Sequence, residues 1–148
     1  MDIRPYVSTD RNACLALFDS NVPDFFDASE RKGFADFLDS PNCAYFVMEH
    51  DDAVVGCGGY AIDGEVGSMV WGMVRRDSQK LGLGRFLLLY RVRKISKAGS
   101  VGLVRLATSQ RTASFFEKQG FKATRVVKDG FAPGIDRVEM VMKLNVCP

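Results

Sequence analysis

The stretch from residue 65 to residue 97 constrains the fold more than any other part of the chain. The strand predicted at 65–74 carries apolar side chains on both faces, with valines on one face and Met69, Trp71 and Met73 on the other. A strand that is apolar on both faces belongs in the middle of a sheet. A polar loop follows, and then a helix predicted at 84–97. The chain is therefore expected to form a sheet that is covered by helices.

The rest of the chain adds strands and helices around this centre. Periodicities of 2 and 3.6 residues, with Gly and Pro as stops, define the other elements. Strands are predicted at 3–7, 44–49, 53–62, 101–108, 121–128 and 137–144, and helices at 10–18, 29–38 and 112–119. The sum is a mixed α/β fold with about seven strands and about four helices, in one domain over residues 1–148.

Composition narrows the compartment and the chemistry. The chain is 47% hydrophobic and 26% charged, which is ordinary for a soluble globular protein. No apolar run approaches the roughly 20 residues of a membrane span, and the first residues lack a signal-peptide pattern. Four scattered cysteines and a single histidine suit neither a disulfide framework nor a metal site. We therefore expect a cytoplasmic protein with no metal and no membrane partner.

Charge is distributed unevenly along the chain. Residues 19–40 hold six acids against two bases, and residues 75–97 hold eight bases against one acid. One segment suits a cation and the other an anion, although two solvated helix faces would give the same pattern.

The sharpest motif is Gln79-Lys80-Leu81-Gly82-Leu83-Gly84-Arg85, between the buried strand and its helix. Two closely spaced glycines let the backbone turn tightly and aim several N–H groups at one point, at a helix N-terminus that favours an anion. Arg76, Lys80 and Arg85 would neutralise a phosphate or pyrophosphate there. The P-loop pattern and the dinucleotide fingerprint are both absent. A Gly-rich turn without a ligand is the alternative interpretation.

This motif resembles a known acyl-CoA signature. Gln79-x-x-Gly82-x-Gly84 after a buried strand is similar to Gln/Arg-x-x-Gly-x-Gly/Ala of the GNAT N-acetyltransferase superfamily. Residues 112–121, which read Thr-Ala-Ser-Phe-Phe-Glu-Lys-Gln-Gly-Phe, are similar to that family's segment A-x-x-L-Y-E-K-L-G-F. The order of elements matches over essentially the whole chain. The resemblance implies a mostly antiparallel sheet with a splayed parallel pair in the middle, formed by the strands at 65–74 and 101–108.

The resemblance also implies acetyl-CoA as co-substrate, together with the residues that hold it. Main-chain groups of Met73 and Val74 would pair with the pantetheine amides, and backbone N–H groups from Leu81 to Arg85 would hold the pyrophosphate. Ser109 stands where the family often has an Asn. The full set of expected coenzyme-binding residues is Met73, Val74, Arg76, Gln79, Lys80, Leu81, Gly82, Leu83, Gly84, Arg85, Ser109, Thr112 and Phe116.

The implied reaction is direct transfer of an acetyl group to a primary amine. A neutral amine attacks the thioester carbonyl, the backbone N–H of Val74 stabilises the oxyanion, and a base takes the amine proton. Phe116 replaces the family's usual general-acid tyrosine, so either the thiolate leaves unassisted or water or another group protonates it. Tyr60 is the best placed of the remaining tyrosines, ahead of Tyr45 and Tyr90. Glu49 and Glu65 are the candidate bases, and a water chain to solvent is the other route.

The acceptor pocket is predicted in the loop between the first two helices. Asp24, Phe25 and Phe26 lie in that loop, which covers the acceptor in the family, and its acidity suits a cationic amine. Trp71 is either a core aromatic or a wall of this pocket. The acceptor is expected to be a small-molecule or peptide amine, and the sequence does not identify it.

Other functions stay open beside this one. An acyl-CoA-binding sensor with the same fold and no turnover would also suit Phe116. Nucleic-acid binding through the bases at 75–97 is disfavoured, because few aromatic residues are interleaved with them. A homodimer that pairs through the strand at 137–144 is one option for assembly.

Overall fold

The computed structural model describes residues 2–144, apart from the side chain of Lys80. The strands are β1 (Asp2–Pro5), β2 (Ala44–His50), β3 (Ala53–Asp63), β4 (Val66–Val74), β5 (Leu103–Thr108), β6 (Lys122–Ala132) and β7 (Ile135–Lys143). The helices are α1 (Arg11–Ser20), α2 (Arg31–Asp39), α3 (Leu83–Lys97) and α4 (Ala113–Lys118). Short 3-10 turns at Ser8–Asp10, Ala28–Glu30 and Arg76–Leu81 precede α1, α2 and α3. The predicted elements are therefore all present.

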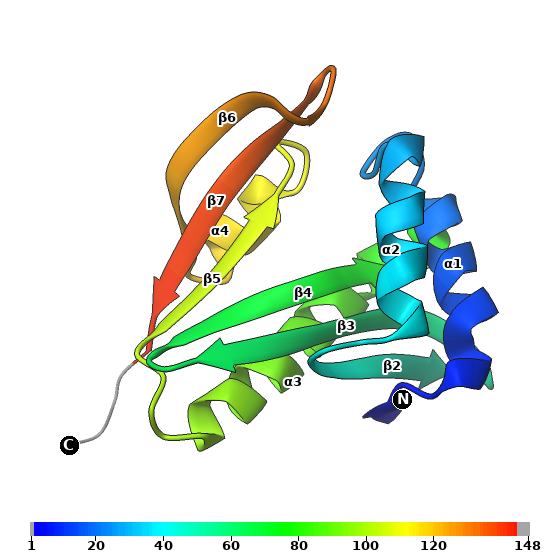
Figure 1. Cartoon of the computed structure of the whole chain (residues 1–148), viewed down its shortest axis with the longest axis horizontal. Coiled ribbons are helices and arrows are strands. Elements are labelled where there is room, and N and C mark those ends of the chain that lie inside the picture. The colour runs from blue at the N-terminus through cyan, green and yellow to red at the C-terminus, as the bar shows by residue number, and fades with distance from the viewer. Residues whose placement is uncertain (1, 145–148) are drawn as a thin grey trace.

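The strands form one seven-stranded sheet in the order β1-β2-β3-β4-β5-β7-β6 (Figure 1). Only β4 and β5 are parallel, and the other neighbours are antiparallel. The predicted fold class, a mixed sheet with one parallel pair in the middle and four helices, is confirmed. The predicted dimer route is wrong, because β7 lies between β5 and β6 and has no free edge.

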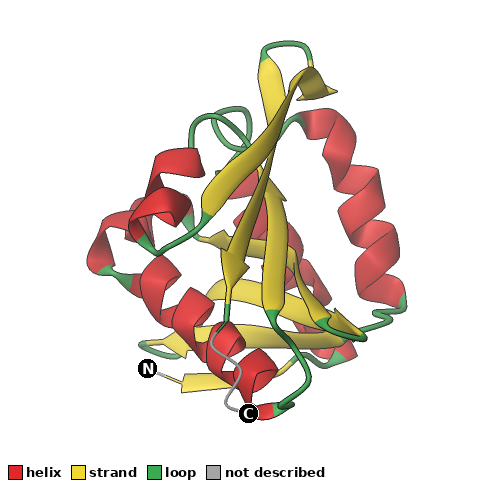
Figure 2. Ribbon diagram, turned by 90° about the vertical axis from the view of Figure 1, so that its left-hand side faces the viewer, coloured by secondary structure: helices red, strands yellow, loops and turns green. Residues whose placement is uncertain are grey.

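Helices cover both faces of the sheet (Figure 2). On one face, α1 and α2 bury Cys14, Phe18, Phe34 and Leu38 against Tyr45, Val47, Cys57 and Met73. On the other face, Leu88 and Ile95 of α3 pack with β5 and β7 residues and with Phe121. A third group, in which Leu83 and Leu87 contact Met48, Val55 and Val74, fixes the start of α3 against the sheet.

The parallel pair opens along most of its length. Its register joins only Val66 to Leu103, Gly67 to Val104 and Ser68 to Arg105. Beyond this point β4 and β5 diverge, and Figure 1 shows the V that they form. The edge of β4 from residue 69 to residue 74 consequently faces an opening instead of a partner strand.

A β-bulge lies in the open part of β4. Cys57 pairs with Met73 and Gly59 with Val70, so β4 has one more residue than β3 over this interval. Trp71 adopts a φ of +39°, in the left-handed region that a bulky side chain rarely occupies. Because a bulge bends and twists its strand, it helps to turn β4 away from β5.

The bulge overturns one predicted detail. Met69 packs with the α3 side, whereas Trp71 and Met73 pack with the α1 and α2 side. The prediction that these three side chains share one face is therefore wrong, because one extra residue reverses the alternation of a strand.

Candidate active site

The N-terminus of α3 follows a glycine in the left-handed region and has no side-chain cap among the described residues. Gly82 precedes the helix with a φ of +78°, and a Cβ there would point into open space. A Cβ on Gly84 would make an ordinary contact with the Phe115 ring at 3.6 Å. No described side chain caps the helix at Gly82. Its first N–H groups are therefore available to a phosphate.

Basic residues surround this helix end. The Arg76 guanidinium lies 4.6 Å from the centre of the Phe25 ring and pairs with Asp24 at 3.2 Å. Arg85 is exposed, and the side chain of Lys80 lies outside the described part of the structure. Leu81 is 66% exposed, whereas Leu83 is buried. The segment 79–85, called the predicted coenzyme loop below, thus has an exposed arginine, Arg85, in the first turn of α3.

Gln79 has a structural role that its place in the motif did not reveal. Its Nε2 donates to Asn21 Oδ1 at 2.6 Å, and Asn21 Nδ2 donates to the Val74 carbonyl at 3.0 Å. Asn21 is only 1% exposed and also donates to Leu17. Sequence reasoning missed Asn21, because a single Asn after a helix reads as an ordinary cap. Together these side chains join α1, the end of β4 and the coenzyme loop.

The main chain at the end of β4 is oriented toward the opening. The N–H of Arg75 donates to the Val55 carbonyl at 2.8 Å, on the β3 side. Because backbone groups alternate along a strand, the N–H of Val74 points to the opposite edge. The Val74 carbonyl already accepts from Asn21 and from Gln79. The Val74 N–H therefore lies on the edge that faces β5.

The segment after β5 is closed by its own hydrogen bonds. Ser109 is buried, and its Oγ accepts from the N–H of Arg111 at 3.2 Å. Thr112 pairs its hydroxyl with that of Thr108. Phe116 packs against Phe115 and Phe121 in the core. These contacts fix the start of α4 beside the opening.

The predicted acids and bases lie at different distances from the bulge. Tyr60 is opposite Met69, close to where β4 and β5 part, and its ring stacks on Phe46. Glu49 pairs with Arg4 at 2.7 Å and is separated from β4 by β3. Glu65 precedes β4 at the closed end of the V, six residues or about 20 Å from Trp71. Of the three, only Tyr60 is brought near the opening.

The loop between α1 and α2 spans the mouth of the V. Arg76, after β4, pairs with Asp24, and Arg111, after β5, donates to the Pro23 and Asp24 carbonyls. Asp27 caps the following 3-10 turn through Ser29. The acidity of this segment is thus largely engaged in local contacts.

The predicted aromatic wall forms one cluster. Phe26 stacks on Phe18 with ring centres 4.9 Å apart and lies 6.3 Å from Trp71. Phe34 lies 5.0 Å from Trp71 on the same side. Trp71 is half-buried, so it both packs in the core and contributes to the surface beneath the loop.

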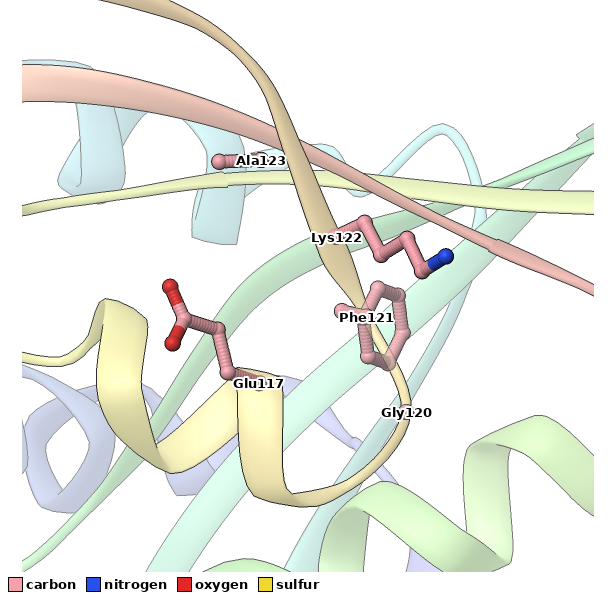
Figure 3. Close-up of a pocket in the computed structure, with 5 residues that line it drawn as sticks. All are labelled: Glu117, Gly120, Phe121, Lys122 and Ala123. Carbon is pink, nitrogen blue, oxygen red and sulfur yellow. The ribbon is translucent and has the colours of Figure 1, made fainter.

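A shallow hollow of about 370 Å³ lies elsewhere, between α4 and β6 (Figure 3). Glu117, Gly120, Phe121, Lys122 and Ala123 line it, and none of them is a predicted site residue. Within residues 2–144, no group of three His, Cys, Asp or Glu side chains could hold a metal ion. No helix of the described chain is long and apolar enough to cross a membrane.

Solved structures share this architecture. A GNAT-family protein from Desulfovibrio desulfuricans gives a TM-score of 0.81 at 22% identity, over 96% of this chain and 98% of that one. The ribosomal-protein-S18-alanine N-acetyltransferase from Escherichia coli gives 0.81 at 16% identity, over 99% and 96%. An aminoglycoside 6'-N-acetyltransferase complexed with coenzyme A gives 0.78 at 14% identity, over 100% and 99%. At these identities the likeness establishes the fold alone.

The family is established by sequence. No curated protein matches the chain significantly. The model of the acetyltransferase (GNAT) family, however, matches residues 14–121, from α1 to the residue before β6. That range holds the coenzyme loop, both strands of the V and the segment after β5. The chain therefore belongs to the GNAT acetyltransferase family.

Proposed function

We propose that this protein transfers an acetyl group from acetyl-CoA directly to a primary amine of a small molecule or peptide. One observation carries the proposal: the opening between β4 and β5 ends beside the N-terminus of α3, which no described side chain caps. An extended arm ending in a pyrophosphate fits this arrangement, because a free strand edge binds amides and a helix N-terminus binds phosphate.

The chain's own residues divide the work along this opening. Backbone N–H groups from Leu81 to Arg85 hold the pyrophosphate, and Arg76 supplies positive charge. The open edge of β4, on which the Val74 N–H lies, positions the pantetheine arm, and the developing oxyanion lies farther along the same edge, beside the bulge. Because Glu49 and Glu65 lie away from the bulge, a water chain to solvent is the proposed route for the amine proton.

An amine acceptor is the finer part of the proposal. Two structural neighbours support an amine acceptor, because their names specify N-acetylation. One acts on a ribosomal-protein alanine and the other on an aminoglycoside. Asp24, Phe25 and Phe26 would contact the acceptor from the spanning loop, with Trp71 beneath. If reversing the charge of Asp24 and Asp27 leaves the acceptor KM unchanged, the loop does not select a cation.

A second candidate is an acyl-CoA sensor without turnover, which Phe116 favours because it cannot donate a proton. Calorimetric titration with acetyl-CoA, followed by a thiol-release assay over a panel of amines, separates the two. Binding with thiol release for some amine supports the transferase. Binding without release across the panel supports the sensor, and absence of binding overturns both.

A further inference from the structure

Arg91 is a buried arginine without a carboxylate partner. It lies on α3 and is only 4% exposed. Its Nε donates to the Leu87 carbonyl at 3.4 Å and its Nη1 to the Gly59 carbonyl at 3.3 Å, both long bonds. Among residues 2–144, no acid forms an ion pair with it. A buried charge without an opposite charge raises the free energy of the folded state, so its presence calls for an explanation.

Two glycines make room for the guanidinium. A Cβ on Gly72 would lie 2.8 Å from Arg91 Nη2, and a Cβ on Gly58 would lie 3.0 Å from its Cζ. Any larger residue at Gly72 or Gly58 would displace the group. The sheet is therefore shaped around this side chain, at the one place where β4 carries its bulge.

One nitrogen of the guanidinium, Nη2, lies next to Gly72. The described residues offer no acceptor to Nη2. No fully enclosed side-chain nitrogen or oxygen in the described chain lacks a partner, so Nη2 is not fully enclosed. Gly72, which Nη2 approaches, is itself exposed. The positive charge therefore lies beneath Gly72, in the part of β4 that has no partner on the β5 side.

The surroundings do not neutralise this charge. Tyr45 and Cys57, the nearest ionisable groups across the sheet, are neutral because burial raises the pKa of each well above its ordinary value. Tyr60 lies on the same face, and Tyr90 and Lys94 lie on α3 itself. Tyr45 also donates to the Trp71 carbonyl at 2.7 Å, so the bulge is held from the face opposite Arg91.

The bulge lies where the thioester would be. Between its phosphate and its sulfur, the pantetheine arm has about a dozen chain atoms, equal to about four extended residues. Val74 lies beside the α3 N-terminus, and Val70 lies four residues before it along β4. The reacting carbonyl and sulfur would then lie beside residues 70–72, with Arg91 behind Gly72.

We propose that Arg91 stabilises the negative charge that develops on the coenzyme A sulfur during acetyl transfer. The inference rests on the proposed function. The amine nitrogen bonds to the carbonyl carbon, the C–S bond breaks, and its electron pair leaves on sulfur, while the ammonium proton passes to water. Phe116 has no proton for the sulfur, and Arg91 acts across Gly72 as a positioning residue whose charge lowers the energy of the thiolate.

The affinity of coenzyme A relative to desulfo-coenzyme A, measured from pH 6 to pH 9, tests this role. An opposite charge near a titrating group, here the coenzyme A thiol, shifts its pKa by about 1–3 units. At pH 9 the affinity for coenzyme A divided by that for desulfo-coenzyme A should therefore be about tenfold higher in the wild type than in Arg91→Met. Arg91→Lys should keep part of the difference. Arg93→Met removes an exposed charge from the same helix and should match the wild type.

Each outcome decides the question. If Arg91→Met weakens both ligands equally, so that its ratio of affinities equals that of the wild type at every pH, the substitution acts through sheet geometry. This result would overturn the role of the charge while the proposed function stood. A ratio at pH 9 that is highest in the wild type, intermediate in Arg91→Lys and lowest in Arg91→Met supports it. If the wild type binds neither ligand, the proposed function fails, and the inference fails with it.

Discussion

Replacing Arg91 with methionine is expected to stabilise the folded protein. Burial lowers the pKa of Arg91 well below its ordinary value, to about 10. Each pKa unit corresponds to about 1.4 kcal/mol, so keeping the charged form in the core costs about 3 kcal/mol. Methionine removes this cost and keeps most of the apolar stem, but it loses two long hydrogen bonds worth about 1 kcal/mol each. The net gain in the free energy of unfolding should be about 1 kcal/mol.

Urea titration at pH 7 measures this gain, and thermal unfolding should show a Tm increase of about 2–4 °C. The gain also has a pH dependence. Both states bind the arginine proton below pH 10, so the full cost is present there. The cost declines as pH rises above the folded pKa toward the higher pKa of the unfolded state. Arg93→Met serves as the control and should leave stability unchanged. If Arg91→Met instead lost more than about 1 kcal/mol, the charge would have a compensating partner, and the reasoning would be refuted.

Three further changes test other parts of the structure. Gly82→Glu puts a carboxylate at the α3 N-terminus, where φ is +78°, so calorimetry should show an acetyl-CoA affinity at least about tenfold lower. Gly134→Glu, at a φ of +77° in the β6–β7 turn, is the matched control, and an equal loss of affinity there would contradict the phosphate site. Asn21→Ala should lower the free energy of unfolding by about 2 kcal/mol in urea, because the Val74 carbonyl loses a buried donor, and an unchanged value would mean that water replaces the amide. Asp10→Asn should be less stable than the wild type at pH 7 and approach it below about pH 4. The ion pair with Arg4 lowers the pKa of Asp10, and its stabilisation disappears as the carboxyl is protonated. A difference in the free energy of unfolding that does not change with pH would argue against this.

The sequence predicted the fold well where a local pattern decides the structure. The apolar run of β4 placed it in the middle of the sheet, and Gly82 with Gly84 located the N-terminus of α3. These features depend on residues that are close in the chain. The parallel pairing of β4 with β5 depended on the family resemblance instead, because periodicity does not determine which strands are neighbours.

Contacts between distant residues were beyond the reach of such patterns. Trp71 reads as one step in a regular alternation, and only its pairing with β3 exposes the extra residue. Arg91 reads as one of several bases on a surface helix, although it is buried beneath two glycines that lie 33 and 19 residues earlier in the chain. Asn21 likewise acquires its role only when α1 meets the end of β4. A register or a burial set by tertiary packing leaves no signal in the local pattern.

Departures from these local rules gather at a single point of the molecule. The left-handed φ of Trp71, the paired Gly58 and Gly72 and the uncompensated charge of Arg91 each raise the free energy of the folded state by about 1–3 kcal/mol. A module that only binds a coenzyme needs the α3 N-terminus and the open strand edge, but nothing unusual at the bulge. Strain is retained where chemistry requires it, and the bulge is where the arm from Gly82 would place the thioester. The clustering therefore favours a transferase over a sensor.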